Sequence, residues 1–174
     1  MYKTGVYFGR FLPPHRGHLY QMIEASTRCE KLLVVISDNA DQTREICRRD
    51  GIPEISYRLR KQWISQQIQD ITHIGVRVLD ETDIPVYPEG WELWSQRMRE
   101  VVGEPIDAFF VGDMEYGETL ARYFPESKVE LFIRLRDQRR VPGLALEAAA
   151  AGQLQNTHYE ACEEEKKLAH GSRS

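Results

Sequence analysis

The sequence predicts an α/β fold in which helices cover both faces of a doubly wound parallel sheet of about five strands. Three observations predict it. Short apolar runs alternate with helix-like segments. The run at 32–36 (LLVVI) is continuously apolar, as strands buried on both faces are. The chain has 174 residues, enough for one such domain but not for two ordinary ones.

The expected strands are the apolar runs at 5–8, 32–36, 74–79, 108–111 and 129–133. Helices are expected at 19–28, after Ser56 as N-cap, after Gly90, and at 117–124. The polar stretch 37–54 is too long for a tight turn and is expected to be a functional or mobile loop.

The carboxyl-terminal part of the chain loses the strand pattern. An alanine-rich, helix-forming stretch at 144–151 is followed by the charged run EEEKK at 163–167. We therefore expect one domain over residues 1–142, and a peripheral helix with a disordered tail over residues 143–174.

Composition excludes several classes of function. The net charge of −4 and a pI of about 5.8 give no reason to expect binding to nucleic acid or to a membrane surface. Cys29, Cys47 and Cys162 are odd in number and lack metal-binding spacing, so they are expected to be reduced thiols. No signal peptide or membrane span is recognisable, which predicts a cytoplasmic protein. The oligomeric state stays open, a homo-oligomer included.

The stretch GRFLPPHRGH at 9–18 lies between the first expected strand and the first expected helix. Gly9 allows a sharp turn and the close approach of a ligand, and the two prolines fix the loop. His15 and His18 are three residues apart, so a helix that begins there presents both imidazoles on one face. Gly17 leaves space between them. The helix N-terminus adds partial positive charge, and the pattern therefore predicts a phosphate site.

Two imidazoles and a helix N-terminus suit a nucleoside triphosphate. Positioning and electrostatics suffice to stabilise the charge on a departing pyrophosphate, without a covalent intermediate. Mg²⁺ is the expected cofactor because it would share that charge, and no site made of protein ligands alone is expected. The alternative is that His15 and His18 are surface histidines of a turn.

The stretch resembles the GxFxPxHxGH signature of the nucleotidyltransferase superfamily, the adenylyl- and cytidylyltransferases with a Rossmann-like fold. Its fixed positions are filled by Gly9, Phe11, Pro13, His15, Gly17 and His18. Within the superfamily the chain is similar to the nicotinamide mononucleotide (NMN) adenylyltransferases, in particular to the domain that bifunctional bacterial NAD-biosynthesis proteins carry ahead of a ribosylnicotinamide kinase. The similarity continues through RLR at 58–60, GWELW at 90–94 and FVGDMEY at 110–116, and covers roughly residues 2–140.

The resemblance implies a reaction in which the phosphate of NMN attacks the α-phosphorus of ATP, giving NAD and pyrophosphate. His18 would stabilise the transition state at the α-phosphate, and His15 would hold the ATP phosphates, so both are expected to be catalytic. The implied ATP-binding residues are Gly9, Arg10, Phe11, His15, Gly17, His18, Gly112 and Asp113. ATP and NMN are the implied partners.

Two aromatic residues are candidates for binding NMN. Trp91 and Trp94 could stack on the nicotinamide ring, whose positive charge favours an aromatic face, and Trp91 is the better candidate because it begins the helix. The alternative is that both belong to a buried stripe with Met98 and Val101.

Polar residues near the expected strand ends also have two interpretations. Asp38 and Asn39 end the second strand on the ligand side and could bind the amide or ribose of NMN, although they also suit a turn. Arg58 and Arg60 could reach a phosphate from the neighbouring helix, or form its solvated face.

One part of the superfamily pattern is missing. Members carry a second phosphate motif, ISxTxxR, after the last strand, but here RRVP at 139–142 is followed by GLALE, and no Ser or Thr occurs between Ser127 and Thr157. Either the altered segment impairs the enzyme, or Arg139, Arg140 and the N–H groups near Gly143 replace the missing motif. Two other hypotheses follow: a transferase with another phosphorylated acceptor, and a sensor that binds ATP or NAD without turnover.

Overall fold

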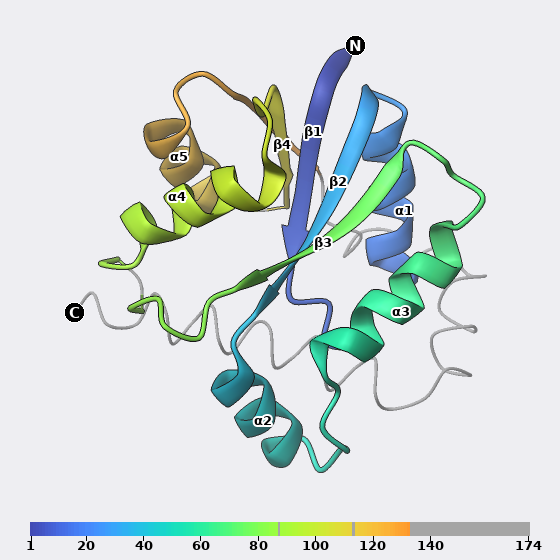
Figure 1. The fold of residues 1–174 in the computed structure, drawn as a ribbon, viewed down its shortest axis with the longest axis vertical. Coiled ribbons are helices and arrows are strands. Elements are labelled where there is room, and N and C mark those ends of the chain that lie inside the picture. The colour runs from blue at the N-terminus through green and yellow to red at the C-terminus, as the bar shows by residue number, and fades with distance from the viewer. Residues whose placement is uncertain (87, 113, 133–174) are drawn as a thin grey trace.

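The computed structural model describes residues 1–86, 88–112 and 114–132 of the chain (Figure 1). Strands and helices alternate along this part. The strands are β1 (Tyr2–Gly9), β2 (Cys29–Asp38), β3 (Ile74–Asp80), β4 (Ala108–Val111) and β5 (Lys128–Leu131). The helices are α1 (Arg16–Ser26), α2 (Ala40–Arg49), α3 (Tyr57–Ile68), α4 (Trp91–Val102) and α5 (Met114–Tyr123).

The strands form one parallel sheet in the order β3-β2-β1-β4-β5. The chain first builds outward from β1 to β3, then returns to the other side of β1, where β4 pairs with it from Gly5↔Ala108 to Tyr7↔Phe110. The order therefore reverses next to β1, and ligands of such sheets bind at the carboxyl ends of the strands beside this reversal. The predicted α/β class with a five-stranded parallel sheet is confirmed.

Two layers of helices enclose the sheet because side chains alternate along each strand. Val6 packs in the core shared with α4 and α5, whereas its neighbour Tyr7 packs in the core shared with α1 and α3. Figure 1 shows α4 and α5 on one side of the sheet and α1 and α3 on the other. Each large apolar side chain buried in these cores contributes about 1.5–3 kcal/mol to folding.

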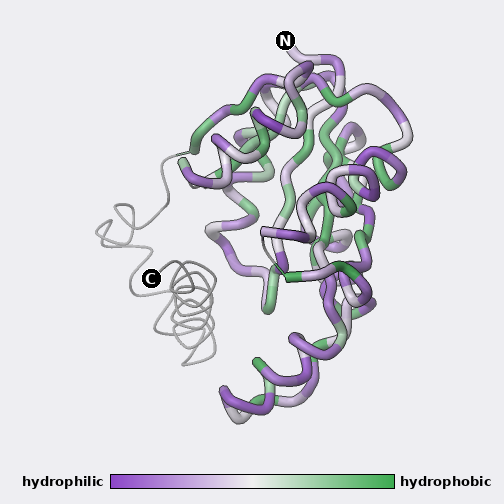
Figure 2. Tube along the Cα trace, turned by 90° about the vertical axis from the view of Figure 1, so that its left-hand side faces the viewer, coloured by the Kyte–Doolittle hydropathy of each residue, from purple (hydrophilic) through white to green (hydrophobic). Residues whose placement is uncertain are grey.

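Residues 37–54 are not a loop throughout, which corrects one expectation. They contain α2, which extends beyond the carboxyl ends of the strands and is mainly hydrophilic (Figures 1 and 2). Asn39 is its N-cap, and Thr43, Ile46 and Cys47 form its buried side. A helix with so narrow an apolar face lacks the broad apolar stripe that identifies an amphipathic helix in a sequence.

Other element boundaries differ by a few residues. Helix α1 begins at Arg16 and ends at Ser26, rather than spanning 19–28, because His15 caps its first turn. Strand β5 ends at Leu131. The expected domain boundary at 142, the tail, Arg139, Arg140 and Cys162 lie outside the described residues, while Cys29 and Cys47 are buried free thiols. Over the part of the chain that is described, no helix is both long and apolar enough to cross a membrane.

Candidate functional site

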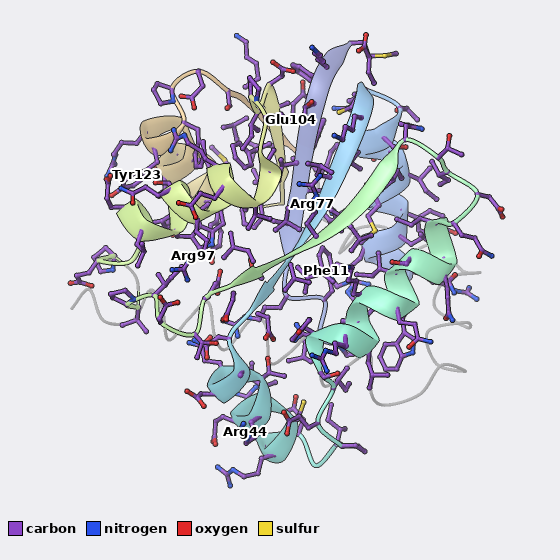
Figure 3. All side chains as sticks on the ribbon, viewed as in Figure 1. Phe11, Arg44, Arg77, Arg97, Glu104 and Tyr123 are labelled. Carbon is purple, nitrogen blue, oxygen red and sulfur yellow. The ribbon has the colours of Figure 1, made fainter. Side chains whose placement is uncertain are left out.

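The loop after β1 is fixed by apolar contacts. Phe11 and Leu12 are 2% and 1% exposed, and Leu12 packs against Ile46, Cys47 and Ile55 beneath α2. Figure 3 places Phe11 between the carboxyl end of β1 and α3. The peptide bond from Leu12 to Pro13 is cis. The burial of Phe11 and Leu12 shows that this loop packs against the core rather than extending into solvent.

The sharp turn in this loop falls on Phe11, not on Gly9, which corrects the expected role of the glycine. Phe11 has φ of 53°, a left-handed conformation that non-glycine residues rarely adopt. Gly9 still ends β1 in regular pairing with Ile36. A Cβ atom on Gly9 would lie 3.3 Å from the Phe11 ring, a tight contact that the ring could relieve only by moving a few tenths of an ångström.

His15 and His18 form a reciprocal cap at the start of α1. The His18 backbone N–H donates to His15 Nδ1 at 3.3 Å, and the His15 backbone N–H donates to His18 Nδ1 at 3.2 Å. The two rings stack with their centroids 3.6 Å apart, and Phe11 meets the His18 ring edge-on at 4.9 Å. The predicted common face is confirmed, and these contacts fix both ring orientations.

The cap also determines which ring nitrogen carries the proton. Because Nδ1 of each ring accepts a backbone N–H, a neutral imidazole in this arrangement carries its proton on Nε2. His15 and His18 are half-buried. The pair therefore lies with its protonated Nε2 atoms beside the positive end of the helix dipole, a position that favours an anion.

A buried charge network lies behind the loop. Arg60 on α3 is 0% exposed, so it belongs neither to the solvated face of α3 nor to an open phosphate site, as the sequence had suggested. Its guanidinium donates through Nη1 to the Arg10 carbonyl at 2.8 Å and through Nη2 to Asp38 Oδ1. Burial lowers the pKa of Arg60, and the hydrogen bond and charge of Asp38 act in the opposite direction.

Asp38 and Asn39 both have partners within the protein. Asp38 is 7% exposed, and its Oδ1 accepts from Arg60 and from Thr43 Oγ1, the latter at 3.2 Å. Asn39 is half-buried and its Oδ1 accepts the Gln42 backbone N–H at 3.2 Å. Their side-chain oxygens therefore organise α2. Binding of NMN by either residue stays a prediction.

The remaining candidates for ATP binding come from β4. Gly112 follows Val111 and is half-buried at the carboxyl end of β4, next to the end of β1 in the sheet. Asp113 lies outside the described residues. The sheet order thus brings Gly9 and Gly112 to one edge although they are far apart in the sequence.

Both tryptophans lie in the core shared by α4 and α5. Trp91 and Trp94 are 8% and 7% exposed. Trp91 stacks on Tyr123 at 6.2 Å, and Trp94 meets Phe8 edge-on at 5.1 Å. The indole N–H of Trp94 donates to Glu81 at 2.8 Å. The buried-stripe interpretation is confirmed for both residues, and stacking on nicotinamide stays a prediction.

Sequence reasoning missed the network around Arg60. Its members Asp38 and Arg10 are 22 and 50 residues away from Arg60, and no spacing rule connects them. The sequence shows only that Arg60 follows Arg58 by two residues on a helix whose N-cap is Ser56. Residues two apart on a helix point in different directions, so the two arginines are not expected to face the same side. Only the packing of α3 on the sheet shows that one of these arginines points inward.

The parallel sheet with its order reversal, together with the capped histidine pair on the loop after β1, resembles the nucleotidyltransferase superfamily. Comparison with known proteins confirms this resemblance. No protein-family model matches the chain. Similarity is instead found to individual proteins and to solved structures.

Two curated relatives are similar to this chain in sequence. The trifunctional NAD biosynthesis/regulator protein NadR of Salmonella typhimurium (strain LT2) is 28% identical over 105 residues, which are 59% of this chain and 25% of that protein. The NadR protein of Escherichia coli (strain K12) is 27% identical over 103 residues, covering 58% and 25%. The matched residues thus make up a quarter of the length of these curated relatives.

Solved structures extend the similarity to most of the chain. A crystal structure of NadR protein in complex with NR superposes with a TM-score of 0.63 at 26% identity, covering 84% of this chain and 41% of that one. A structure of NadR protein in complex with NAD and AMP-PNP gives 0.60 at 26% identity, covering 83% and 40%. A bifunctional NMN adenylyltransferase/ADP ribose pyrophosphatase from Francisella tularensis gives 0.59 at 22% identity, covering 76% and 38%, and shows a shared fold.

Proposed function

We propose that this chain is a nucleotidyltransferase of NAD metabolism that transfers the adenylyl group of ATP to NMN, forming NAD and pyrophosphate. The capped pair of His15 and His18 carries the proposal, because it lies at the N-terminus of α1, directly after the loop that leaves the carboxyl end of β1. The similarity to NadR proteins, described as NAD biosynthesis proteins and crystallised with NR or with NAD and AMP-PNP, supports the substrates.

In the proposed step, a phosphate oxygen of NMN attacks the α-phosphorus of ATP. One P–O bond forms there, and the bond from the α-phosphorus to the bridging oxygen of the β-phosphate breaks. The electron pair leaves with pyrophosphate. His18 Nε2–H would stabilise the negative charge on the α-phosphate, while His15 and the backbone of Gly9, Arg10 and Phe11 would hold the triphosphate.

Mg²⁺ is the proposed cofactor. The described residues contain no group of three or more His, Cys, Asp or Glu side chains arranged to hold a metal ion. Mg²⁺ commonly binds through substrate phosphates with one or two carboxylates and several waters. Bound to the triphosphate, Mg²⁺ would neutralise part of its negative charge.

The test is NAD formation from ATP and NMN in a coupled assay, comparing the wild type with His18→Ala. Losing a donor to the transition state should lower turnover by about a hundredfold or more. His73→Ala is the matched control, because the His73 ring contacts the Ser26 carbonyl at the opposite end of the sheet. Normal turnover in His18→Ala would refute the assignment.

The absence of Ser and Thr between residues 127 and 157 favours one second candidate, a sensor that binds ATP or NAD without turnover. Calorimetric binding of ATP with no release of pyrophosphate would support the sensor and exclude the transferase. Quenching of tryptophan fluorescence by NMN, but not by other phosphorylated acceptors, would instead support NMN as the substrate of a transferase.

A further inference from the structure

The guanidinium of Arg60 connects three segments that are separate in the sequence. It donates to the carbonyl of Arg10 in the loop after β1 at 2.8 Å, to Asp38 at the end of β2, and through Nε to the carbonyl of Ser56 at 3.4 Å. The side chain is 0% exposed. A lysine ammonium could not replace it, because only the planar guanidinium presents donors in several fixed directions.

Helix α2 closes these contacts into a ring. Thr43 Oγ1 donates to the same Asp38 oxygen at 3.2 Å, and Arg10 Nη2 donates to Gln42 Oε1 at 2.5 Å. Thr43 and Gln42 are neighbours in the first turns of α2. One closed ring of polar contacts around Arg60 therefore joins the loop after β1, the end of β2, α2 and α3.

The contact with Arg10 has a geometric effect on the next residue. A trans peptide is planar, with its C=O and N–H pointing in opposite directions, and the bond from Arg10 to Phe11 is trans. When Arg60 holds the Arg10 carbonyl, it fixes the direction of the Phe11 N–H away from itself. Phe11, whose N–H is oriented in this way, has the left-handed φ of 53°.

Stability alone is a weak reason for this arrangement. Taking a charged pair out of water costs several kcal/mol per ion, and well-packed apolar residues of similar volume often stabilise a protein as much or more. Here the buried pair makes specific contacts to a backbone carbonyl and to the cap region of α2. Such contacts determine geometry, which an apolar replacement would not do.

We propose that Arg60, with Asp38 as its counter-ion, is a positioning residue that sets the backbone of residues 9–11 for binding the phosphates of ATP. The inference rests on the proposed function for the identity of the nucleotide. It assigns Asp38 to the support of this loop rather than to a direct contact with NMN.

The primary variants are Arg60→Lys and Asp38→Asn. Arg60→Lys keeps the positive charge but loses the planar guanidinium and its fixed donor directions, and Asp38→Asn keeps the shape of the side chain but loses its negative charge. Lys61→Arg is the matched control, because it makes the reciprocal exchange at an exposed position of the same helix. Folding of every variant is checked first by near-UV circular dichroism, and hydrogen exchange of peptides covering residues 9–14 is then measured without ligand.

We expect faster exchange in residues 9–14 of both primary variants and wild-type exchange in Lys61→Arg. The Kd for ATP per folded molecule should rise about tenfold or more, because small displacements of positioning groups have large effects, while the KM for NMN stays within about twofold. A loss of stability alone would lower the folded fraction without changing the Kd of the folded molecules. Wild-type exchange and wild-type affinity for ATP in folded Arg60→Lys would overturn the inference.

Two further outcomes are informative. If Asp38→Asn raises the KM for NMN and leaves ATP binding unchanged, Asp38 is a direct NMN ligand and the inference is wrong. If Arg60→Lys does not fold, Thr43→Val replaces it as the test, because it removes only the hydroxyl contact to Asp38. Thr43→Val must then show faster exchange in residues 9–14 and a higher Kd for ATP, both to a smaller extent. A wild type that makes no NAD refutes the proposed function, whereas the exchange experiment tests the positioning role without any nucleotide.

Discussion

Replacing His15 should separate its role as a helix cap from its role in chemistry. His15→Ala removes the Nδ1 atom that accepts the His18 backbone N–H at 3.3 Å. Losing an N-cap acceptor costs about 1 kcal/mol, which lowers the Tm of a domain of this size by about 2–4 °C. His15→Asn supplies another good cap acceptor, so its stability should stay within about 0.5 kcal/mol of the wild type.

Both variants lose the imidazole and should therefore lose turnover to a similar degree, about tenfold to a hundredfold. Denaturant unfolding followed by tryptophan fluorescence measures the first effect, and the coupled NAD assay measures the second. Ser56→Ala provides the benchmark for cap loss, because Ser56 Oγ accepts the Leu59 N–H at 3.3 Å. Recovery of turnover together with stability in His15→Asn would show that the ring acts only as a cap.

Two further predictions concern stability. Gly90→Ala should destabilise the protein by about 3 kcal/mol or more, because its Cβ would lie 1.9 Å from the Pro85 carbonyl oxygen. Denaturant unfolding measures this loss, with Glu89→Ala at an exposed position as the control. Equal stability of the two variants would contradict the prediction. Burial raises the pKa of Cys29 from 9.0 to about 11. The folded state thus keeps this proton longer than the unfolded state, and roughly 2–3 kcal/mol of stability should be lost as the pH rises from about 9 to 11. Unfolding measured across that range should show a shallower loss in Cys29→Ala, and an identical pH dependence would exclude the thiol as its source.

Most of the fold could be predicted because buried parallel strands are continuous apolar runs. Residues 108–111 match β4 in both bounds, and Ser56 caps α3 as expected. Helix α2 was missed because its buried side consists of Thr43, Ile46 and Cys47 alone. Its cap and its charges, Asp41 near the start and Arg48 near the end, carried the signal that could have found it.

The candidate site could be predicted only where it is local in sequence. The spacing of His15 and His18 sufficed for the shared helix face, since three residues separate neighbours on a helix. The conformation of Phe11 and the inward direction of Arg60 could not be predicted, because each depends on segments that meet only in the folded sheet. Local rules also could not decide whether Trp91 faces a ligand or the core.

The pairing of β1 with β4 should make the ordered loop after β1 a late product of folding. Residues 5–7 of β1 pair on one side with residues 108–110 of β4. The central strand β1 therefore has both of its neighbours only after most of the described chain has folded. Closing such distant segments is slow compared with local contacts. Acquisition of affinity for ATP during refolding should therefore report the completed sheet rather than its first half.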